Sequence, residues 1–223
     1  MQGRELIDTV EVPGGEALRL LRRGDEYIIA IGASELMSSR MSGSEEALAT
    51  MSCERLRNSK NARLLIGGYG MGFTLRAALA ALGPDAQITV AELVPAIIDW
   101  ARGPMAALAG GCLDDRRVNL VIGDVAATIA DAPRRFDAIL LDVDNGPDGL
   151  VRAENDRLYS PVGLAAAKAA LRPGGLLAIW SAAPDVRFTR RLAAAGYRVD
   201  EVHVRARAAG KGARHVIWFA QTD

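Results

Sequence analysis

The sequence predicts an α/β fold in which helices cover both faces of a doubly wound, mostly parallel sheet. From Leu64 onward, short apolar runs typical of strands alternate with helical runs, which is the pattern of parallel strands joined by crossover helices. The first of these runs, Leu64–Ile66, leads into a glycine-dense turn and then into a predicted helix over 75–82. Acidic residues stand at the ends of the following strands.

Residues 1–33 are predicted to form a small N-terminal β element that precedes the main domain, residues 34–223. Strand-like runs over 17–23 and 26–31 flank a Gly24-Asp25 turn, which is a hairpin signal. Residues 35–40 look like a polar joint between the two parts. The next segment is predicted to be a helix, with Ser44 as its N-cap and two glutamates in its first turn.

The glycine-dense turn carries Gly68, Gly70 and Gly72 in alternating G-x-G-x-G spacing. It is not G-x-G-x-x-G, because Phe73 follows Gly72 directly. A turn of this kind lets a ligand approach bare backbone N–H groups at a helix N-terminus. It therefore predicts a pocket for a nucleotide or nucleoside.

Three carboxylates end predicted strands further along the chain. Glu92 ends the strand over 87–92, where it could accept hydrogen bonds from both ribose hydroxyls. Asp124 follows the strand over 118–122 and suits either an adenine amino group or the N-cap of the next helix. Asp142 ends the strand over 136–142. Because ligands of such sheets bind at the carboxyl ends of the strands, these residues should converge on one cleft with Gly68.

The C-terminal third is predicted to continue the alternation with helices over 164–171 and 188–195 and a strand over 176–180. The last two strands, over 198–204 and 215–220, have no helix between them. They therefore indicate an antiparallel hairpin at the edge of the sheet.

Composition excludes several classes of function. Lys plus Arg and Asp plus Glu both number 27, so charge gives no reason to expect a nucleic-acid partner. No apolar run is long enough to span a membrane, and Met1–Glu5 has no signal-peptide pattern, so we expect a cytoplasmic protein. Two cysteines and two histidines that lie far apart make a metal centre unexpected.

These motifs resemble the spermidine synthase branch of the class I S-adenosylmethionine-dependent transferases. The resemblance covers the N-terminal β element, a helix start with Glu46, the Ile-Gly-Gly turn, Gly123-Asp124, the run ending at Asp142, and the Arg-Pro-Gly-Gly run over 172–175. It implies a Rossmann-like, class I methyltransferase-type fold. It also implies a small-molecule acceptor and a homodimer.

The resemblance assigns two sets of site residues. The catalytic candidates are Asp142 and Asp144, which would accept a proton or orient the nucleophile, although both could equally be loop caps. The candidates for binding the donor are Gly67, Gly68, Tyr69, Gly70, Gly72, Glu92, Leu93, Gly123, Asp124, Val125 and Asp142.

The chain departs from the family pattern at Gly70, where the family has an aspartate that holds the amine of the aminopropyl donor. Loss of that carboxylate would remove a charge-assisted hydrogen bond worth about 1.5–3 kcal/mol. On this ground we expect methyl transfer from S-adenosylmethionine to a small molecule. One alternative is aminopropyl transfer from decarboxylated S-adenosylmethionine to a diamine. Another is a non-catalytic nucleoside-binding protein. Product-like ligands would be S-adenosylhomocysteine or methylthioadenosine.

Overall fold

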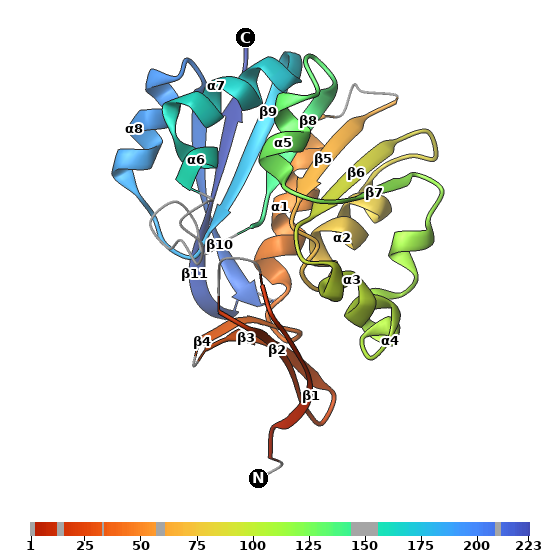
Figure 1. Ribbon diagram of the computed structural model, residues 1–223. Helices are drawn as coiled ribbons and strands as arrows, with labels where there is room; N and C mark the ends of the chain where they lie inside the picture. Colours follow the sequence, from red (N-terminus) through yellow and green to blue (C-terminus); the bar gives the residue numbers. More distant parts are fainter. Residues whose placement is uncertain (1–2, 13–15, 33, 57–60, 144–155, 208–210) are drawn as a thin grey trace.

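The computed structural model describes residues 3–12, 16–32, 34–56, 61–143, 156–207 and 211–223. Its main part is a seven-stranded sheet in the order β10-β11-β9-β8-β5-β6-β7 (Figure 1). The central strands are β5 (Arg63–Gly67), β6 (Gln87–Glu92), β7 (Val118–Ile122), β8 (Phe136–Leu141) and β9 (Leu171–Ser181), and they run parallel. The antiparallel hairpin of β10 (Arg198–Arg207) and β11 (Lys211–Gln221) extends the β9 edge. The predicted fold class is thus confirmed.

Helices cover both faces of this sheet (Figure 1). One face packs against α1 (Gly43–Arg55), α2 (Phe73–Ala81) and α3 (Pro95–Arg102) and forms an apolar core that includes Leu48, Ile66 and Val90. The other face packs against α5 (Val125–Ala130), α7 (Pro161–Ala170) and α8 (Val186–Ala194) around Phe188 and Trp218. The remaining short helices are α4 (Ala106–Ala109), η1 (Cys112–Asp114) and α6 (Asp156–Tyr159). No helix in the described part of the chain is long and apolar enough to cross a membrane.

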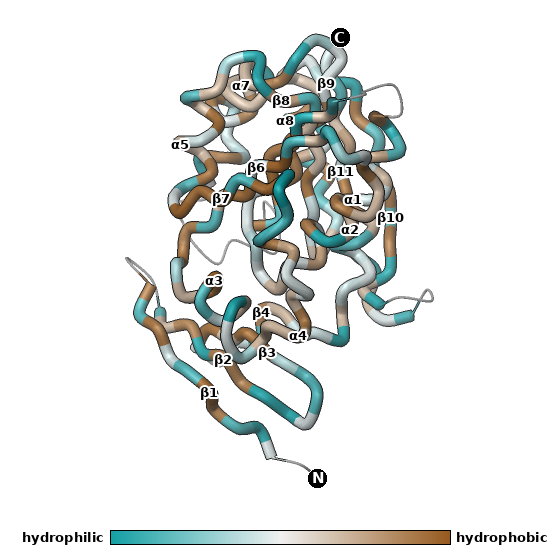
Figure 2. The backbone as a smooth tube through the Cα atoms, turned by 90° about the vertical axis from the view of Figure 1, so that its right-hand side faces the viewer, coloured by the Kyte–Doolittle hydropathy of each residue, from teal (hydrophilic) through white to brown (hydrophobic). Residues whose placement is uncertain are grey.

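A separate antiparallel sheet, β1 (Glu5–Val10), β2 (Leu18–Arg23), β3 (Glu26–Ile31) and β4 (Ser34–Ser38), lies at the end of the molecule opposite the C-terminus (Figures 1 and 2). The Trp100 indole donates a hydrogen bond of 2.7 Å to Asp8 Oδ2, and the Tyr27 hydroxyl donates one of 2.5 Å to the Pro104 carbonyl. These bonds join the small sheet to the α3–α4 region of the main domain.

Two local expectations differ from the structure. The predicted polar joint over 35–40 contains most of β4, which pairs with β3 and so satisfies an edge that would otherwise be open. The small sheet therefore continues past residue 33, and the division at 33/34 stays a prediction about domain organisation. Ser44 is not the N-cap of α1, because that position belongs to Ser42. The Ser44 side chain instead contacts Glu45 and His215.

Candidate functional site

A cavity opens at the carboxyl ends of β5, β6 and β8 and is closed on one side by the N-terminal sheet. This is the point where the strand order reverses, since β5 is followed by β6 on one side and has β8 on the other. The predicted residues that line the cavity are Gly68, Gly70, Glu92, Leu93, Gly123, Asp124, Val125 and Asp142. The convergence expected from four separate segments is therefore present.

The glycine turn holds the ends of three strands together. The Gly68 N–H donates to the Ala91 carbonyl at 2.9 Å, and the Asp142 N–H donates to the Gly67 carbonyl at 3.0 Å. Gly68 has φ +85°, and a β-carbon placed on it would lie 2.4 Å from the Asp142 carbonyl oxygen. Only glycine fits there, because the backbone conformation is left-handed and the neighbouring chain is in the way.

Glu92 is 5% exposed and lines the cavity. Its two carboxylate oxygens accept backbone hydrogen bonds, from Tyr69 at 2.8 Å and from Val94 at 2.9 Å. Burial raises the pKa of Glu92, and the backbone hydrogen bonds oppose that rise. A carboxylate fixed in this way keeps lone pairs that can accept hydrogen bonds from ribose hydroxyls.

Asp124 is the N-cap of α5, and its side chain accepts a hydrogen bond of 2.8 Å from the Ala126 N–H. It also forms an ion pair with Arg157 of α6. Since a carboxylate has about four acceptor sites, the cap leaves room for a ligand. Contact with an adenine amino group stays a prediction.

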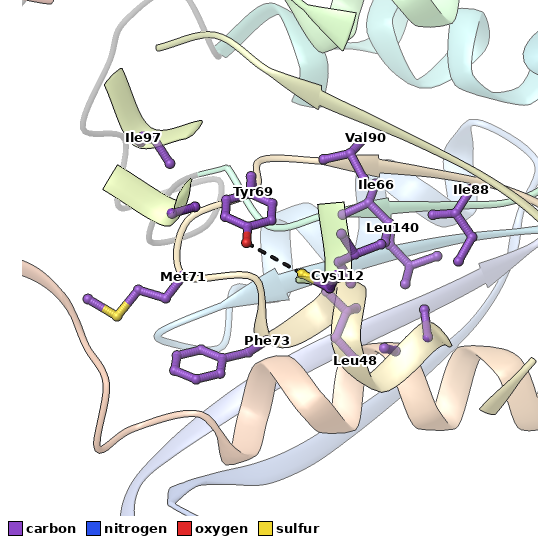
Figure 3. Close-up of a cluster of buried hydrophobic side chains, with 14 of the residues drawn as sticks. Leu48, Ile66, Tyr69, Met71, Phe73, Ile88, Val90, Ile97, Cys112 and Leu140 are labelled. Atoms are coloured by element: carbon purple, nitrogen blue, oxygen red, sulfur yellow. Dashed lines mark hydrogen bonds between the residues drawn. The ribbon is translucent and has the colours of Figure 1, made fainter. Parts of the chain in front are cut away.

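Three of the predicted donor-binding residues shape the turn but do not line the cavity: Gly67, Tyr69 and Gly72. The Tyr69 ring points into the apolar cluster of Met71 and Phe73, and its hydroxyl lies 3.5 Å from Cys112 Sγ (Figure 3). A β-carbon on Gly72 would lie 2.7 Å from the Tyr69 hydroxyl. Of Gly67, Tyr69 and Gly72, only the backbone atoms are thus in a position to contact a ligand, and that role stays a prediction.

Asp142 lines the same cavity, and Thr74 Oγ1 donates a hydrogen bond of 2.9 Å to its Oδ2 atom. Burial raises the pKa of Asp142, and the bond from Thr74 opposes that rise. The second predicted catalytic residue, Asp144, lies outside the described residues.

Sequence reasoning missed Glu45, which lines the same cavity and is 7% exposed. The Ser44 hydroxyl lies 2.6 Å from Glu45 Oε2 and 2.9 Å from His215 Nδ1. Burial first, and the neighbouring Asp142 carboxylate second, raise the pKa of Glu45 to about 8. The available signal was the acidic helix start, but a sequence cannot show which side of that helix turns inward.

Sequence reasoning also missed the apolar wall of the cavity. Met37 from β4 and Trp180 from β9 line it, together with Val12, Leu18, Ile29, Ile31 and Leu36. The Trp180 indole nitrogen is buried and has no hydrogen-bond partner among the described residues. An alternating strand pattern predicts an inward face for each strand, but not which cavity that face will meet.

The fold and the cavity define a Rossmann-like protein of the class I methyltransferase type. The solved structures that resemble it include a spermidine synthase from Thermotoga maritima, with a TM-score of 0.77 and 18% identity over 98% of this chain and 73% of that one. Another is a spermidine synthase in complex with the transition-state analogue AdoDATO, with a TM-score of 0.76. At this level of identity the likeness shows the fold alone.

Residues 41–189 match the model of the spermine/spermidine synthase domain, and the chain belongs to that family. A polyamine aminopropyltransferase of Mycobacterium tuberculosis is 33% identical over 193 residues, which cover 82% of this chain and 35% of the relative. One from Korarchaeum cryptofilum is 30% identical over 115 residues, which cover 52% of this chain and 34% of the relative. The chain thus spans about a third of the length of these curated relatives.

These findings contradict the expectation of a methyltransferase. The curated relatives are named polyamine aminopropyltransferases, and the matching family model is that of the spermine/spermidine synthase domain. The expectation rested on the missing carboxylate at Gly70 and took that position as decisive. The expectation did not take into account that a carboxylate can reach the same cavity from another element, as Glu45 does from α1.

Proposed function

We propose that this chain binds decarboxylated S-adenosylmethionine and transfers its aminopropyl group to an amine of the polyamine class. The observation that carries the proposal is the pair of carboxyl groups, Glu45 and Asp142, in the cavity that also contains Glu92. Among the described residues, no Lys or Arg forms an ion pair with either member of the pair. Buried acids without a cation suit a substrate that brings its own ammonium groups.

The nucleoside end of the cavity would bind the part of the donor that becomes methylthioadenosine. Glu92 would accept hydrogen bonds from the ribose, and Asp124 would accept one from the adenine amino group. The turn at Gly68 and Gly70 lets the sulfonium end approach the backbone closely, because neither residue has a side chain. The relatives' names and the family membership support the same donor.

In the proposed reaction, the nitrogen of the acceptor amine attacks the aminopropyl carbon that is bonded to the sulfonium sulfur. The C–N bond forms as the C–S bond breaks, and the bonding electron pair leaves with sulfur in methylthioadenosine. The nitrogen then gives up one proton, which we assign to Asp142 as general base. The chain mainly aligns the two reactants and accepts that proton. A role for Asp144 in accepting the proton or orienting the amine stays a prediction.

The test is incubation of the purified chain with decarboxylated S-adenosylmethionine and putrescine, with both spermidine and methylthioadenosine measured. We expect the two products in equal amounts, and no product when S-adenosylmethionine replaces the decarboxylated donor. Tight donor binding without turnover on a panel of diamines and polyamines would contradict the proposal and favour a non-catalytic nucleoside-binding protein.

We also infer a homodimer in the cytoplasm, as the family resemblance suggests. Light scattering on the purified chain would test the first inference. Fractionation of the source cells would test the second.

A further inference from the structure

The carboxyl groups of Glu45 and Asp142 are each held in place by a hydroxyl group. Ser44 contacts Glu45 Oε2 at 2.6 Å, and Thr74 donates to Asp142 Oδ2 at 2.9 Å. The Thr74 hydroxyl also lies 3.4 Å from the Glu45 backbone carbonyl. Because Thr74 belongs to the first turn of α2, this turn fixes α1 and the end of β8 relative to each other.

Within the part of the chain that the structure describes, the charged groups around Glu45 are mostly acidic. Asp142 faces it from the end of β8, Glu46 follows it on α1, and Glu92 lies further along the same cavity. The basic group on the other side is His215 of β11, which reaches Glu45 only through the Ser44 hydroxyl and whose pKa is lowered by burial. This cluster therefore has a deficit of positive charge that a ligand can fill.

Position 70 cannot supply the carboxylate for such a ligand. A β-carbon on Gly70 would lie 2.9 Å from Met37 Cε and 3.0 Å from Met37 Sδ. The thioether of Met37 thus fills the space next to the turn that a side chain at position 70 would need. A ligand cation that lies near the turn must find its anion on another element.

We propose that Glu45, together with Asp142, binds the primary ammonium group at the end of the donor's aminopropyl chain. This inference rests on the proposed function, because it assumes that the nucleoside in the cavity carries such a chain. It makes Glu45 a residue for donor specificity: the residue should favour nucleosides that have the amine over nucleosides that lack it.

Calorimetric titration tests the proposal with two ligands that share the nucleoside: decarboxylated S-adenosylmethionine, which has the ammonium group, and methylthioadenosine, which does not. We expect Glu45→Gln to weaken binding of the first by about tenfold to a hundredfold, the range for a lost charge-assisted hydrogen bond. Binding of methylthioadenosine should change by less than about threefold, and this ligand therefore also reports that the variant is folded. Because methylthioadenosine also lacks the sulfonium charge, its S-methyl sulfonium derivative is the charge control and should change as little. The matched control is Glu46→Gln, which makes the same substitution at the next residue, outside the cavity lining.

A second readout is the proton balance of binding. An ammonium group beside Glu45 favours its ionised form, so wild-type protein at pH 7 should release protons when it binds the amine-bearing donor. Titrations in buffers of different ionisation enthalpy measure this release. It should be smaller for methylthioadenosine and smaller in Glu45→Gln, but unchanged in Glu46→Gln.

The outcomes separate this inference from the proposed function. If wild-type protein binds neither nucleoside, the proposed function fails. If it binds both and Glu45→Gln weakens both equally, or neither, Glu45 has no specific contact with the amine and the inference alone is overturned. If Glu45→Gln spares the donor but weakens putrescine binding to the protein–methylthioadenosine complex, the ammonium group belongs to the acceptor, and the assignment to the donor is wrong.

Discussion

A methyl group added at Gly68 would meet the backbone of the neighbouring strand rather than a movable side chain. Its β-carbon would lie 2.4 Å from the Asp142 carbonyl oxygen, and the residue would have to keep φ +85°. A non-glycine residue in the left-handed region costs about 1–2 kcal/mol. Relief of the clash requires the ends of β5 and β8 to separate, which weakens the hydrogen bond between the Asp142 N–H and the Gly67 carbonyl, worth about 1 kcal/mol. We therefore expect Gly68→Ala to lower the free energy of unfolding by about 3 kcal/mol.

Gly70→Ala is the matched control, because it makes the same chemical change two residues further along the turn. Its φ is +55°, so the conformational cost is again about 1–2 kcal/mol. Its β-carbon, however, meets only the end of the flexible Met37 side chain, which can rotate away. Urea denaturation, analysed by midpoint and slope, measures both variants. A Gly68→Ala variant as stable as Gly70→Ala would refute the view that close contact between the turn and the Asp142 backbone constrains the site.

Three further predictions concern Glu92, Glu45 and the N-cap of α8, where the Asp185 side chain accepts hydrogen bonds from the Arg187 and Phe188 N–H groups. Glu92→Gln should weaken methylthioadenosine binding by about tenfold or more in calorimetry. The reason is that an amide NH2 group would face a donor, either the Tyr69 or Val94 N–H or a ribose hydroxyl, where the carboxylate accepts. Unchanged affinity would exclude Glu92 from the site. The raised pKa of Glu45 means that the folded chain holds a proton that the unfolded chain loses, so stability should fall as pH rises from about 4.5 to about 8. Glu45→Gln should reduce that slope in urea denaturations along a pH series, and an equal slope would contradict the assignment. Asp185→Ala removes the N-cap of α8 and should cost about 1–2 kcal/mol in the same denaturation assay without weakening methylthioadenosine binding, because α8 lies outside the cavity.

Most of the fold could be predicted because its signals are local. The run from Leu64 through Gly72 specifies a strand, a turn and a helix within a few residues, and Glu92 follows at the end of the next strand. β4 could not be predicted, because its sequence has no strong strand pattern and it forms only when β3 provides an edge. The cap of α1 was misplaced for a related reason: the Ser44 hydroxyl has its partners on Glu45 and on β11, which is distant in the sequence.

The candidate site was predictable to the extent that it lies at strand ends. Gly68, Glu92, Asp124 and Asp142 were found because the carboxyl ends of parallel strands always meet on one edge of the sheet. Glu45 was missed because its inward orientation depends on how α1 packs against α2 and β9, and a helix start looks the same whichever way it turns. The expectation of methyl transfer was drawn from position 70 alone, without the Glu45 carboxylate that the structure places in the cavity.

The cavity has walls from two sheets that are hydrogen-bonded separately: the N-terminal sheet contributes Leu18, Ile29 and Met37, and the main sheet contributes Gly68 and Asp142. A nucleoside bound there would touch both, and its binding free energy would add to the contacts that already join them, such as the hydrogen bond from Trp100 to Asp8. The occupied protein should therefore protect the backbone amides of β2 and β3 from hydrogen exchange better than the empty one does. A bound nucleoside would thus connect the small sheet to the main domain.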